Sequence, residues 1–209
     1  YYRESFSLMI LDKFYPIFEK TEWLEKLLPV GIKLVQLRIK DQSIKETQNE
    51  IKKAKSLCSE FNTQLVVNDY WEIAIDEKCD FVHIGQEDLV NCDIKRLKAS
   101  NIRIGISTHD EKELEAALLH SPDYIALGPI YPTIFKKMKW HQQGVDKLSK
   151  WKKKINNIPL VAIGGMTPSR SIMAFNAGAD IVSAVTDITL NKHPETRVKE
   201  WMEVIRNNV

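Results

Sequence analysis

Short apolar runs alternate with longer amphipathic stretches along almost the whole chain. Eight runs have the length and the apolar content of strands, and each is followed by a stretch that reads as a helix. The predicted strands are residues 14–18, 34–38, 65–68, 81–84, 102–107, 124–128, 160–163 and 181–185. The predicted helices are residues 22–28, 44–61, 71–77, 93–99, 111–120, 145–154, 168–177 and 195–207. Strands joined through helices pair in parallel, because each helix returns the chain to the edge where it started.

Eight strand–helix units in 209 residues predict a compact (β/α)₈ TIM barrel, with residues 1–209 forming a single α/β domain. An open doubly wound sheet is the competing architecture. That fold binds its ligand through a glycine-rich loop after the first strand, and no such loop follows residue 18 here. We therefore expect the ligand-binding residues at the carboxyl ends of the barrel strands.

Composition and charge exclude several classes of protein. The net charge is +2, so the overall charge does not require nucleic acid as a partner. No apolar run approaches the length of a membrane span. Cys58, Cys79 and Cys92 lack the paired spacing of a metal site, and we expect reduced thiols in a cytoplasmic protein. The sequence is compatible with a homo-oligomer and does not specify one.

Two neighbouring predicted strands end in acids and amides. Asn68 and Asp69 follow the third strand, and residues 85–88, which include Asp88, follow the fourth. The carboxyl ends of parallel neighbours lie on one rim, so these side chains should meet there. Mg²⁺ takes one or two carboxylates together with substrate phosphate oxygens, so the rim suits that ion. In the alternative interpretation Asp69 and Asp88 only cap the helices that follow.

Side-chain alternation predicts an anion site inside the mouth of the barrel. Gln36, Arg38 and Lys40 share one face of the second strand, and the apolar residues between them share the other, which should face the helices. Two cations and an amide in line suit a bound anion, because unpaired charge is seldom buried. The alternative is a structural Arg38, which would need a carboxylate partner of its own. On the fifth strand Ser107 and His109 should also point inward, with His109 as a candidate for substrate contact.

Two later segments add to the predicted site. The inward residues of the sixth and seventh strands should be small, which leaves space for a ligand; they are Ala126, Gly128, Ala162 and Gly164. The seventh strand then runs into Gly165 and a helix start, where backbone N–H groups can bind an anion. The loop at 129–143 is long for its position and carries Thr133, three lysines including Lys136, and Trp140. It is either a lid over a diphosphate or a solvated basic loop.

His83 shares its face of the fourth strand with Phe81, and we expect it to be a hydrogen-bonded interior residue. The sequence contains no recognisable nucleophilic triad, zinc cluster or dinucleotide fingerprint. Charge placement therefore favours phosphate chemistry.

Several motifs follow one another in order over nearly the whole chain: QLRIK, VNDY, VHIGQEDL, GISTH, DYIALGPIYPT, a following Lys, and PLVAIGGMTP. This pattern resembles the thiamine phosphate synthase family, whose members are (β/α)₈ barrels. The resemblance implies two small-molecule substrates. Such an enzyme joins 4-amino-5-hydroxymethyl-2-methylpyrimidine diphosphate to 4-methyl-5-(2-phosphoethyl)thiazole and releases diphosphate. Its chemistry is departure of Mg²⁺-bound diphosphate, followed by attack of the thiazole nitrogen on a pyrimidine-stabilised methyl cation.

The resemblance also implies roles for individual residues. Asp69 and Asp88 would hold Mg²⁺. The residues implied around the pyrimidine diphosphate are Gln36, Arg38, Lys40, Asn68 and Lys136, with Ser107 in contact with the organic substrates. The residues implied around the thiazole phosphate are Thr133, Gly165, Val185 and Thr186. The catalytic residues among them would be Arg38, Lys40, Lys136 and Ser107.

The sequence departs from the family pattern at four places. Phe135 replaces the second Thr of the loop at 129–143, and Tyr70 replaces a charged residue. Glu19 stands where Asp is common, and Thr186-Asp187 replaces a Ser-Ala pair, which would bring negative charge near an anion if Asp187 pointed inward. Two alternative functions stay open. One is a thiazole tautomerase with His109 transferring the proton, and the other is a non-catalytic barrel that binds a thiamine precursor.

Overall fold

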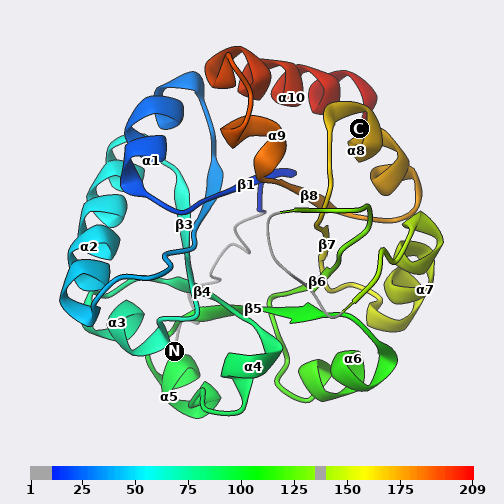
Figure 1. Ribbon diagram of the computed structural model, residues 1–209. Coiled ribbons are helices and arrows are strands. Elements are labelled where there is room, and N and C mark those ends of the chain that lie inside the picture. Colours follow the sequence, from blue (N-terminus) through cyan, green and yellow to red (C-terminus); the bar gives the residue numbers. More distant parts are fainter. Residues whose placement is uncertain (1–10, 135–139) are drawn as a thin grey trace, which may run out of the picture.

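The strands form a closed ring in sequence order, with the helices outside it (Figure 1). The computed structural model describes residues 11–134 and 140–209. The strands are β1 (Phe14–Phe18), β2 (Leu34–Leu37), β3 (Gln64–Asn68), β4 (Phe81–Ile84), β5 (Arg103–Thr108), β6 (Tyr124–Leu127), β7 (Leu160–Ala162) and β8 (Ile181–Ala184). All neighbours are parallel, and β1 pairs with β8 to close the ring. The predicted (β/α)₈ barrel is confirmed.

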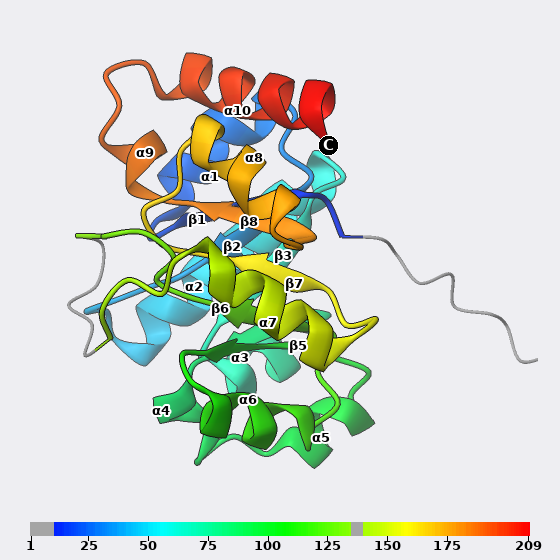
Figure 2. The same ribbon diagram turned by 90° about the vertical axis from the view of Figure 1, so that its right-hand side faces the viewer.

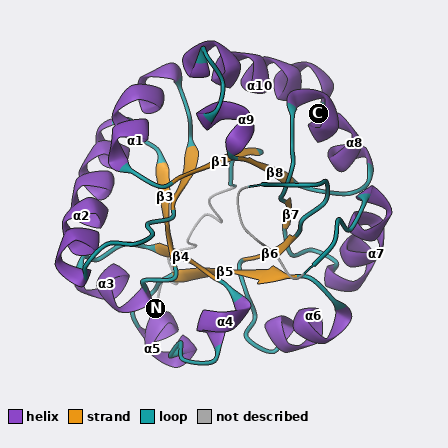
Figure 3. Ribbon diagram, in the orientation of Figure 1, coloured by secondary structure: helices purple, strands orange, loops and turns teal. Residues whose placement is uncertain are grey.

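The helices cover the outside of the ring (Figure 3). The main ones are α1 (Thr21–Leu27), α2 (Ile44–Glu60), α3 (Trp71–Asp76), α5 (Ile94–Ala99), α6 (Glu111–Leu118), α7 (Val145–Ile155), α8 (Pro168–Asn176) and α10 (Pro194–Asn208). A 3₁₀ turn, η1 (Leu28–Val30), extends α1. Within the described residues, no helix combines the length and the apolar character that a membrane crossing requires.

Two further helices were not predicted from the sequence: α4 (Gln86–Leu89) and α9 (Thr186–Thr189). Each begins at or near the end of a strand and is a single turn, too short to show helical periodicity. Both lie on the side of the barrel that carries the carboxyl ends of the strands, together with the loop after β6 (Figure 2). They therefore place Asp88 and Thr186 on the rim of the barrel.

Strand alternation divides the core into two layers. The residues between barrel and helices include Leu37 and Ile39, as expected from the parity of β2. The inner layer, which fills the barrel, consists of Tyr15, Leu34, Val66, Phe81, Tyr124, Ala126, Val161 and Ile181. Gly105 belongs to this arrangement, because a Cβ at that position would overlap the ring of Tyr124. The inner layer forms a packed floor beneath the open end of the barrel.

The expected inward direction of Ala162 is wrong. Val161 is in register with inward-facing Ala126 and belongs to the inner layer, whereas Ala162 belongs to the outer one. Residues paired in register share a face, so Ile163 points into the barrel mouth and lines the cavity described below. β7 spans only three residues, and so short a run does not fix the parity by pattern alone.

Candidate active site

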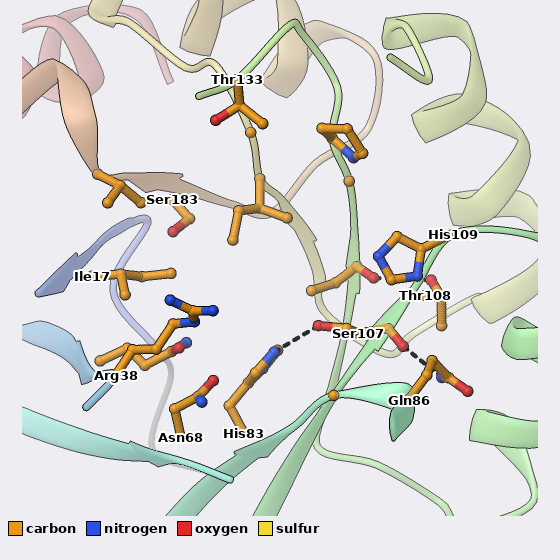
Figure 4. A pocket seen from close by; sticks show the side chains of 18 of the residues that line it. Ile17, Arg38, Asn68, His83, Gln86, Ser107, Thr108, His109, Thr133 and Ser183 are labelled. Carbon is orange, nitrogen blue, oxygen red and sulfur yellow. Dashed lines mark hydrogen bonds between the residues drawn. The ribbon is translucent and has the colours of Figure 1, made fainter. Parts of the chain in front are cut away.

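A cavity of about 440 Å³ opens at the carboxyl ends of the strands, the position at which barrels of this kind hold their ligands. Figure 4 shows side chains from several strands converging on it. The predicted site residues that line it are Gln36, Arg38, Lys40, Asn68, Asp69, Asp88, Ser107, His109, Thr133, Gly165, Val185 and Thr186. Lys136 and Phe135 lie outside the described residues. Twelve residues spread over the chain thus meet at one cavity, as expected for residues at the carboxyl ends of barrel strands.

Asp69 and Asp88 flank Gly85 at one edge of the cavity. A Cβ on Gly85 would lie 3.7 Å from Asp69 Oδ1 and 3.9 Å from Asp88 Oδ2. Asp69 adopts a left-handed backbone with φ of 63°, and its Oδ1 accepts a hydrogen bond of 3.2 Å from the Gly85 N–H. Asn68 Nδ2 donates to Asp69 Oδ2 at 2.5 Å, and Lys40 Nζ lies 3.8 Å from the same oxygen. The carboxylates are thus held toward each other.

The capping alternative for the two aspartates is not what the structure contains. The N-cap of α3 is Tyr70, and Asp88 lies inside α4. α5 is capped by Asp93, whose carboxylate accepts a 2.9 Å hydrogen bond from the N–H of Arg96. Asp69 and Asp88 are therefore available to the cavity.

The electrostatics of this edge favour a cation. Burial raises the pKa of Asp88, and the charge of Asp69 and its hydrogen bond to Asp88 raise it further, while Lys40 opposes the shift. Among the described residues, no group of three or more His, Cys, Asp or Glu side chains could hold a metal ion. Two carboxylates beside an open cavity nevertheless fit Mg²⁺, which is commonly held by one or two carboxylates with water and substrate phosphate.

The basic side chains that follow β2 reach the same edge. Arg38 is mostly buried, and its Nη1 lies 3.7 Å from Glu19 Oε1. Glu19 is one of the departures from the family pattern, so this departure contacts a residue predicted to bind the diphosphate. Figure 4 shows the Arg38 side chain beside Asn68. Gln36 is buried at the cavity floor, and its Nε2 donates to the hydroxyl of Tyr15 at 2.9 Å. The anion site predicted from strand parity therefore has Lys40 next to the carboxylate pair and Arg38 beside Asn68.

Ser107 faces the cavity from β5 and has two partners from β4 and α4. Its Oγ lies 2.7 Å from His83 Nε2, and its backbone carbonyl accepts a 2.7 Å hydrogen bond from Gln86 Nε2 (Figure 4). His83 is buried, and its Nδ1 lies 2.7 Å from the Tyr124 hydroxyl. The prediction that His83 is a hydrogen-bonded interior residue is confirmed. Its Nε2 also forms a hydrogen bond with Ser107, a predicted residue of the site.

His109 forms part of the cavity wall. Its Nδ1 lies 2.7 Å from Glu113 Oε2, and its ring stacks on Trp140 with 5.6 Å between centroids and an interplanar angle of 5°. Lys147 Nζ donates to the His109 carbonyl at 2.8 Å. Glu113, which also lines the cavity, was missed in the sequence because it lies one helical turn beyond the strand end.

The opposite edge of the cavity is built from the turns after β7 and β8. Gly165 has φ of 62°, a left-handed conformation that favours glycine, and a Cβ there would overlap Tyr131 and the carbonyl of Pro132. Val185 and Thr186 begin α9 beside it. This edge thus brings backbone and a hydroxyl group close to the cavity.

Asp187 points away from the cavity. Its carboxylate accepts hydrogen bonds from Arg197 Nε at 2.8 Å, Arg197 Nη2 at 2.9 Å and Trp201 Nε1 at 2.8 Å. These partners lie on α10. The negative charge that the sequence would bring near an anion is therefore turned outward and paired.

Ser183 and Ile17 line the cavity and were not predicted as site residues. Ser183 is buried on β8, and its hydroxyl has no hydrogen-bond partner among the described residues. Strand alternation could have identified both residues. Ser183 is in register with inward-facing Tyr15, and Ile17 lies two residues after Tyr15 on the same strand.

A closed eight-stranded barrel with carboxylates and cations gathered at its carboxyl rim is a TIM barrel whose polar cavity has the position and chemistry of an active site. The sequence matches the model of the family described as thiamine monophosphate synthase over residues 10–188. The chain belongs to this family and is a transferase of thiamine biosynthesis that acts on small molecules.

Individual relatives agree with this assignment. A thiamine-phosphate synthase of Rhizobium etli is 50% identical over 194 residues, which is 93% of this chain and 95% of the relative. A thiamine-phosphate synthase of Citrobacter koseri is 37% identical and covers 90% of this chain and 86% of its own length. Among solved structures, thiamine phosphate pyrophosphorylase from Pyrococcus furiosus aligns with a TM-score of 0.83 at 24% identity, covering 94% of this chain and 96% of that one. The last likeness concerns the fold alone.

Proposed function

We propose that the protein joins 4-amino-5-hydroxymethyl-2-methylpyrimidine diphosphate to 4-methyl-5-(2-phosphoethyl)thiazole in a Mg²⁺-dependent reaction that yields thiamine phosphate and diphosphate. One observation carries the proposal. The cavity has a carboxylate pair and two cations at one edge, and glycine-rich and helix-start backbone at the other. Two anionic substrates can therefore lie across the same cavity with their organic parts between the edges.

The leaving diphosphate belongs at the edge with Asp69 and Asp88, which would hold Mg²⁺. When bound, the ion offsets the negative charge that develops on the departing diphosphate. Arg38 and Lys40 are fixed positive charges that also stabilise the negative charge on the diphosphate oxygens. Lys136 is proposed as a third cation there.

The thiazole phosphate belongs at the edge with Gly165, Val185 and Thr186, and Thr133 lies in the loop facing it. Backbone N–H groups at a helix start can donate hydrogen bonds to a phosphate without a charged side chain. The outward ion pair of Asp187 with Arg197 supports this placement, because it removes a repulsive carboxylate from the phosphate.

The bond changes require little acid–base chemistry from the protein. The C–O bond to diphosphate breaks with both electrons leaving on oxygen, and the lone pair of the thiazole nitrogen forms the new N–C bond. Charge balances without a proton transfer. The residues of the protein bind, orient and exclude water, and Ile17, Ile163 and Met166 provide apolar surface for this in the cavity lining.

One alternative activity has a specific observation in its favour. His109 and Glu113 form a close imidazole–carboxylate pair at the cavity wall, an arrangement that suits proton transfer. A thiazole tautomerase would use that pair and would work without Mg²⁺ and without Asp88.

The test follows thiamine phosphate by fluorescence after oxidation, with both substrates and Mg²⁺ present. We expect product from the wild type and a large loss in Asp88→Ala. Asp93→Ala is the matched control, because it removes an aspartate that caps α5 outside the cavity. Mg²⁺ should also raise the melting temperature of the wild type and not of Asp88→Ala. Folded wild-type protein that binds either substrate and forms no product would overturn the proposal in favour of the tautomerase or a binding protein.

We also infer a cytoplasmic location. Its support is that Cys58, Cys79 and Cys92 are free thiols, as expected in a reducing compartment. Burial raises the pKa of Cys58 to about 12 and that of Cys79 to about 11. Such thiols are poor nucleophiles and resist oxidation.

A further inference from the structure

A chain of hydrogen bonds crosses the inside of the barrel directly beneath the cavity. Gln36 Nε2 lies 2.9 Å from the Tyr15 hydroxyl, which lies 2.9 Å from the Tyr124 hydroxyl. The Tyr124 hydroxyl lies 2.7 Å from His83 Nδ1, and His83 Nε2 lies 2.7 Å from Ser107 Oγ. These residues come from β2, β1, β6, β4 and β5. The polar groups therefore link the diphosphate side of the site to Ser107 through the protein interior.

One direction of hydrogen bonding along this chain follows when Gln36 Nε2 is the donor at its end and every hydroxyl hydrogen is used in a bond. Gln36 presents its N–H to Tyr15, so the single hydrogen of Tyr15 must point to the oxygen of Tyr124. The hydrogen of Tyr124 then points to His83 Nδ1, which must be the acceptor. A neutral imidazole that accepts at Nδ1 carries its hydrogen on Nε2 and donates from there. His83 is thereby set as a donor to Ser107.

Burial favours the neutral, hydrogen-bearing form of both phenols in the chain. Tyr15 and Tyr124 are fully buried, and burial raises the pKa of both phenols well above the ordinary value of 10.0. Each phenol therefore keeps its hydrogen in the neutral range. The ring of His83 stacks on that of Tyr124 at 5.7 Å between centroids and 22° between planes, which fixes the plane of the imidazole.

We propose that the chain from Gln36 to His83 makes Ser107 a hydrogen-bond donor to the pyrimidine substrate, with Tyr124 and His83 as positioning residues. The inference rests on the proposed function and deepens it. A serine hydroxyl has one hydrogen, and while its oxygen accepts from His83 that hydrogen is free to point into the cavity. There it meets an acceptor atom of the substrate, such as a ring nitrogen. With the opposite tautomer of His83, Ser107 would donate to the imidazole and offer the substrate only lone pairs.

The decisive variants are His83→Gln and His83→Asn, measured for kcat and KM of thiamine phosphate formation. The amide nitrogen of Gln reaches the place of Nε2 and can still donate to Ser107. The amide of Asn reaches only the place of Nδ1, so it can bond to Tyr124 and not to Ser107. We expect kcat of the Asn variant to fall at least about tenfold below that of the Gln variant, which corresponds to one lost hydrogen bond. Melting temperatures should change alike in the two variants, because both replace the same buried ring.

A second pair of variants tests the direction without changing His83. Tyr124→Phe removes the hydrogen that holds His83 Nδ1 as an acceptor, whereas Tyr15→Phe removes a hydroxyl one link farther away. We expect the larger loss of kcat in Tyr124→Phe and a smaller one in Tyr15→Phe. Equal losses within both pairs, or a more active Asn than Gln variant, would overturn the inference while an active wild type leaves the synthase proposal intact. An inactive wild type would overturn the proposed function and this inference with it.

Discussion

The Ser183 hydroxyl is a polar group buried at the cavity with no hydrogen-bond partner in the part of the chain that the structure describes. It is 1% exposed, and no hydrogen bond reaches it from the described residues. Such a group costs the ligand-free protein about 1–3 kcal/mol. The structure tolerates this cost because the residue faces the substrate cavity, where a ligand can supply the missing bond.

We therefore expect Ser183→Ala to separate stability from binding. The variant should be as stable as the wild type or more stable by about 1 kcal/mol, because the unpaired hydroxyl is gone. Its KM should rise for the substrate that contacts this position. Urea unfolding and steady-state kinetics measure the two effects.

Ser171→Ala is the matched control for this change. The Ser171 hydroxyl is equally buried, but it donates to the Pro168 carbonyl at 2.6 Å on the outer side of the barrel. Its removal should lower stability and leave KM unchanged. A loss of stability in Ser183→Ala with an unchanged KM would show that its hydroxyl is paired within the protein.

Single side chains divide into those whose direction the sequence predicts and those whose direction depends on distant partners. Gln36, Arg38 and Lys40 were predicted to face the cavity because alternation along a strand is a local property. The direction of Asp187 was not predictable in this way. Its partners Arg197 and Trp201 lie on the following long helix, and no neighbouring residue in the sequence indicates them. The same limit applied to Ala162, whose direction is set by the register with β6.

At the scale of elements, the regular strands and helices were predictable and the single-turn helices were not. The eight strands and eight larger helices lie within a few residues of their predicted bounds, because the strands are short apolar runs and the helices between them are amphipathic. α4 and α9 bury few side chains, and each forms where the chain leaves a strand. They carry Asp88 and Thr186, so the least predictable elements position two of the predicted site residues.

Gly105 is the point at which β5 makes room for Tyr124. A Cβ there would overlap the Tyr124 ring, so Gly105→Ala must displace the ring from the inner layer. We expect a loss of about 1–3 kcal/mol in the free energy of unfolding, as for overpacked cores. The displaced Tyr124 hydroxyl would also lose His83, so kcat should fall as in Tyr124→Phe.

A double variant tests whether Gly105→Ala and Tyr124→Phe lower kcat through the same hydrogen bond. Tyr124→Phe in the Gly105→Ala background should lower kcat far less than it does alone, because the hydrogen bond is already lost. Additive effects of the two substitutions on kcat would contradict the account. Chemical denaturation and steady-state kinetics on the three variants provide the measurements.

At the scale of the whole molecule, closure of the ring joins the two ends of the chain. β1 pairs with β8 through Phe14 and Val182, Tyr15 and Ser183, and Pro16 and Ala184. The first strand therefore has its full set of neighbours only when the last strand is in place. α10 covers this seam, since Trp201 stacks on Phe14 with 5.4 Å between ring centroids and 20° between planes.

Trp201 should accordingly control the stability of the first strand from the far end of the sequence. It is fully buried and its Nε1 donates to Asp187, so Trp201→Ala should cost about 3–5 kcal/mol. Native-state hydrogen exchange should then show faster opening of β1, β8 and α10 as one unit. Trp201→Phe keeps a ring against Phe14 and loses only the indole N–H, so its cost should be smaller and confined to α9 and α10. Rapid exchange limited to α10 in Trp201→Ala, with β1 as protected as in the wild type, would show that the seam holds without this helix.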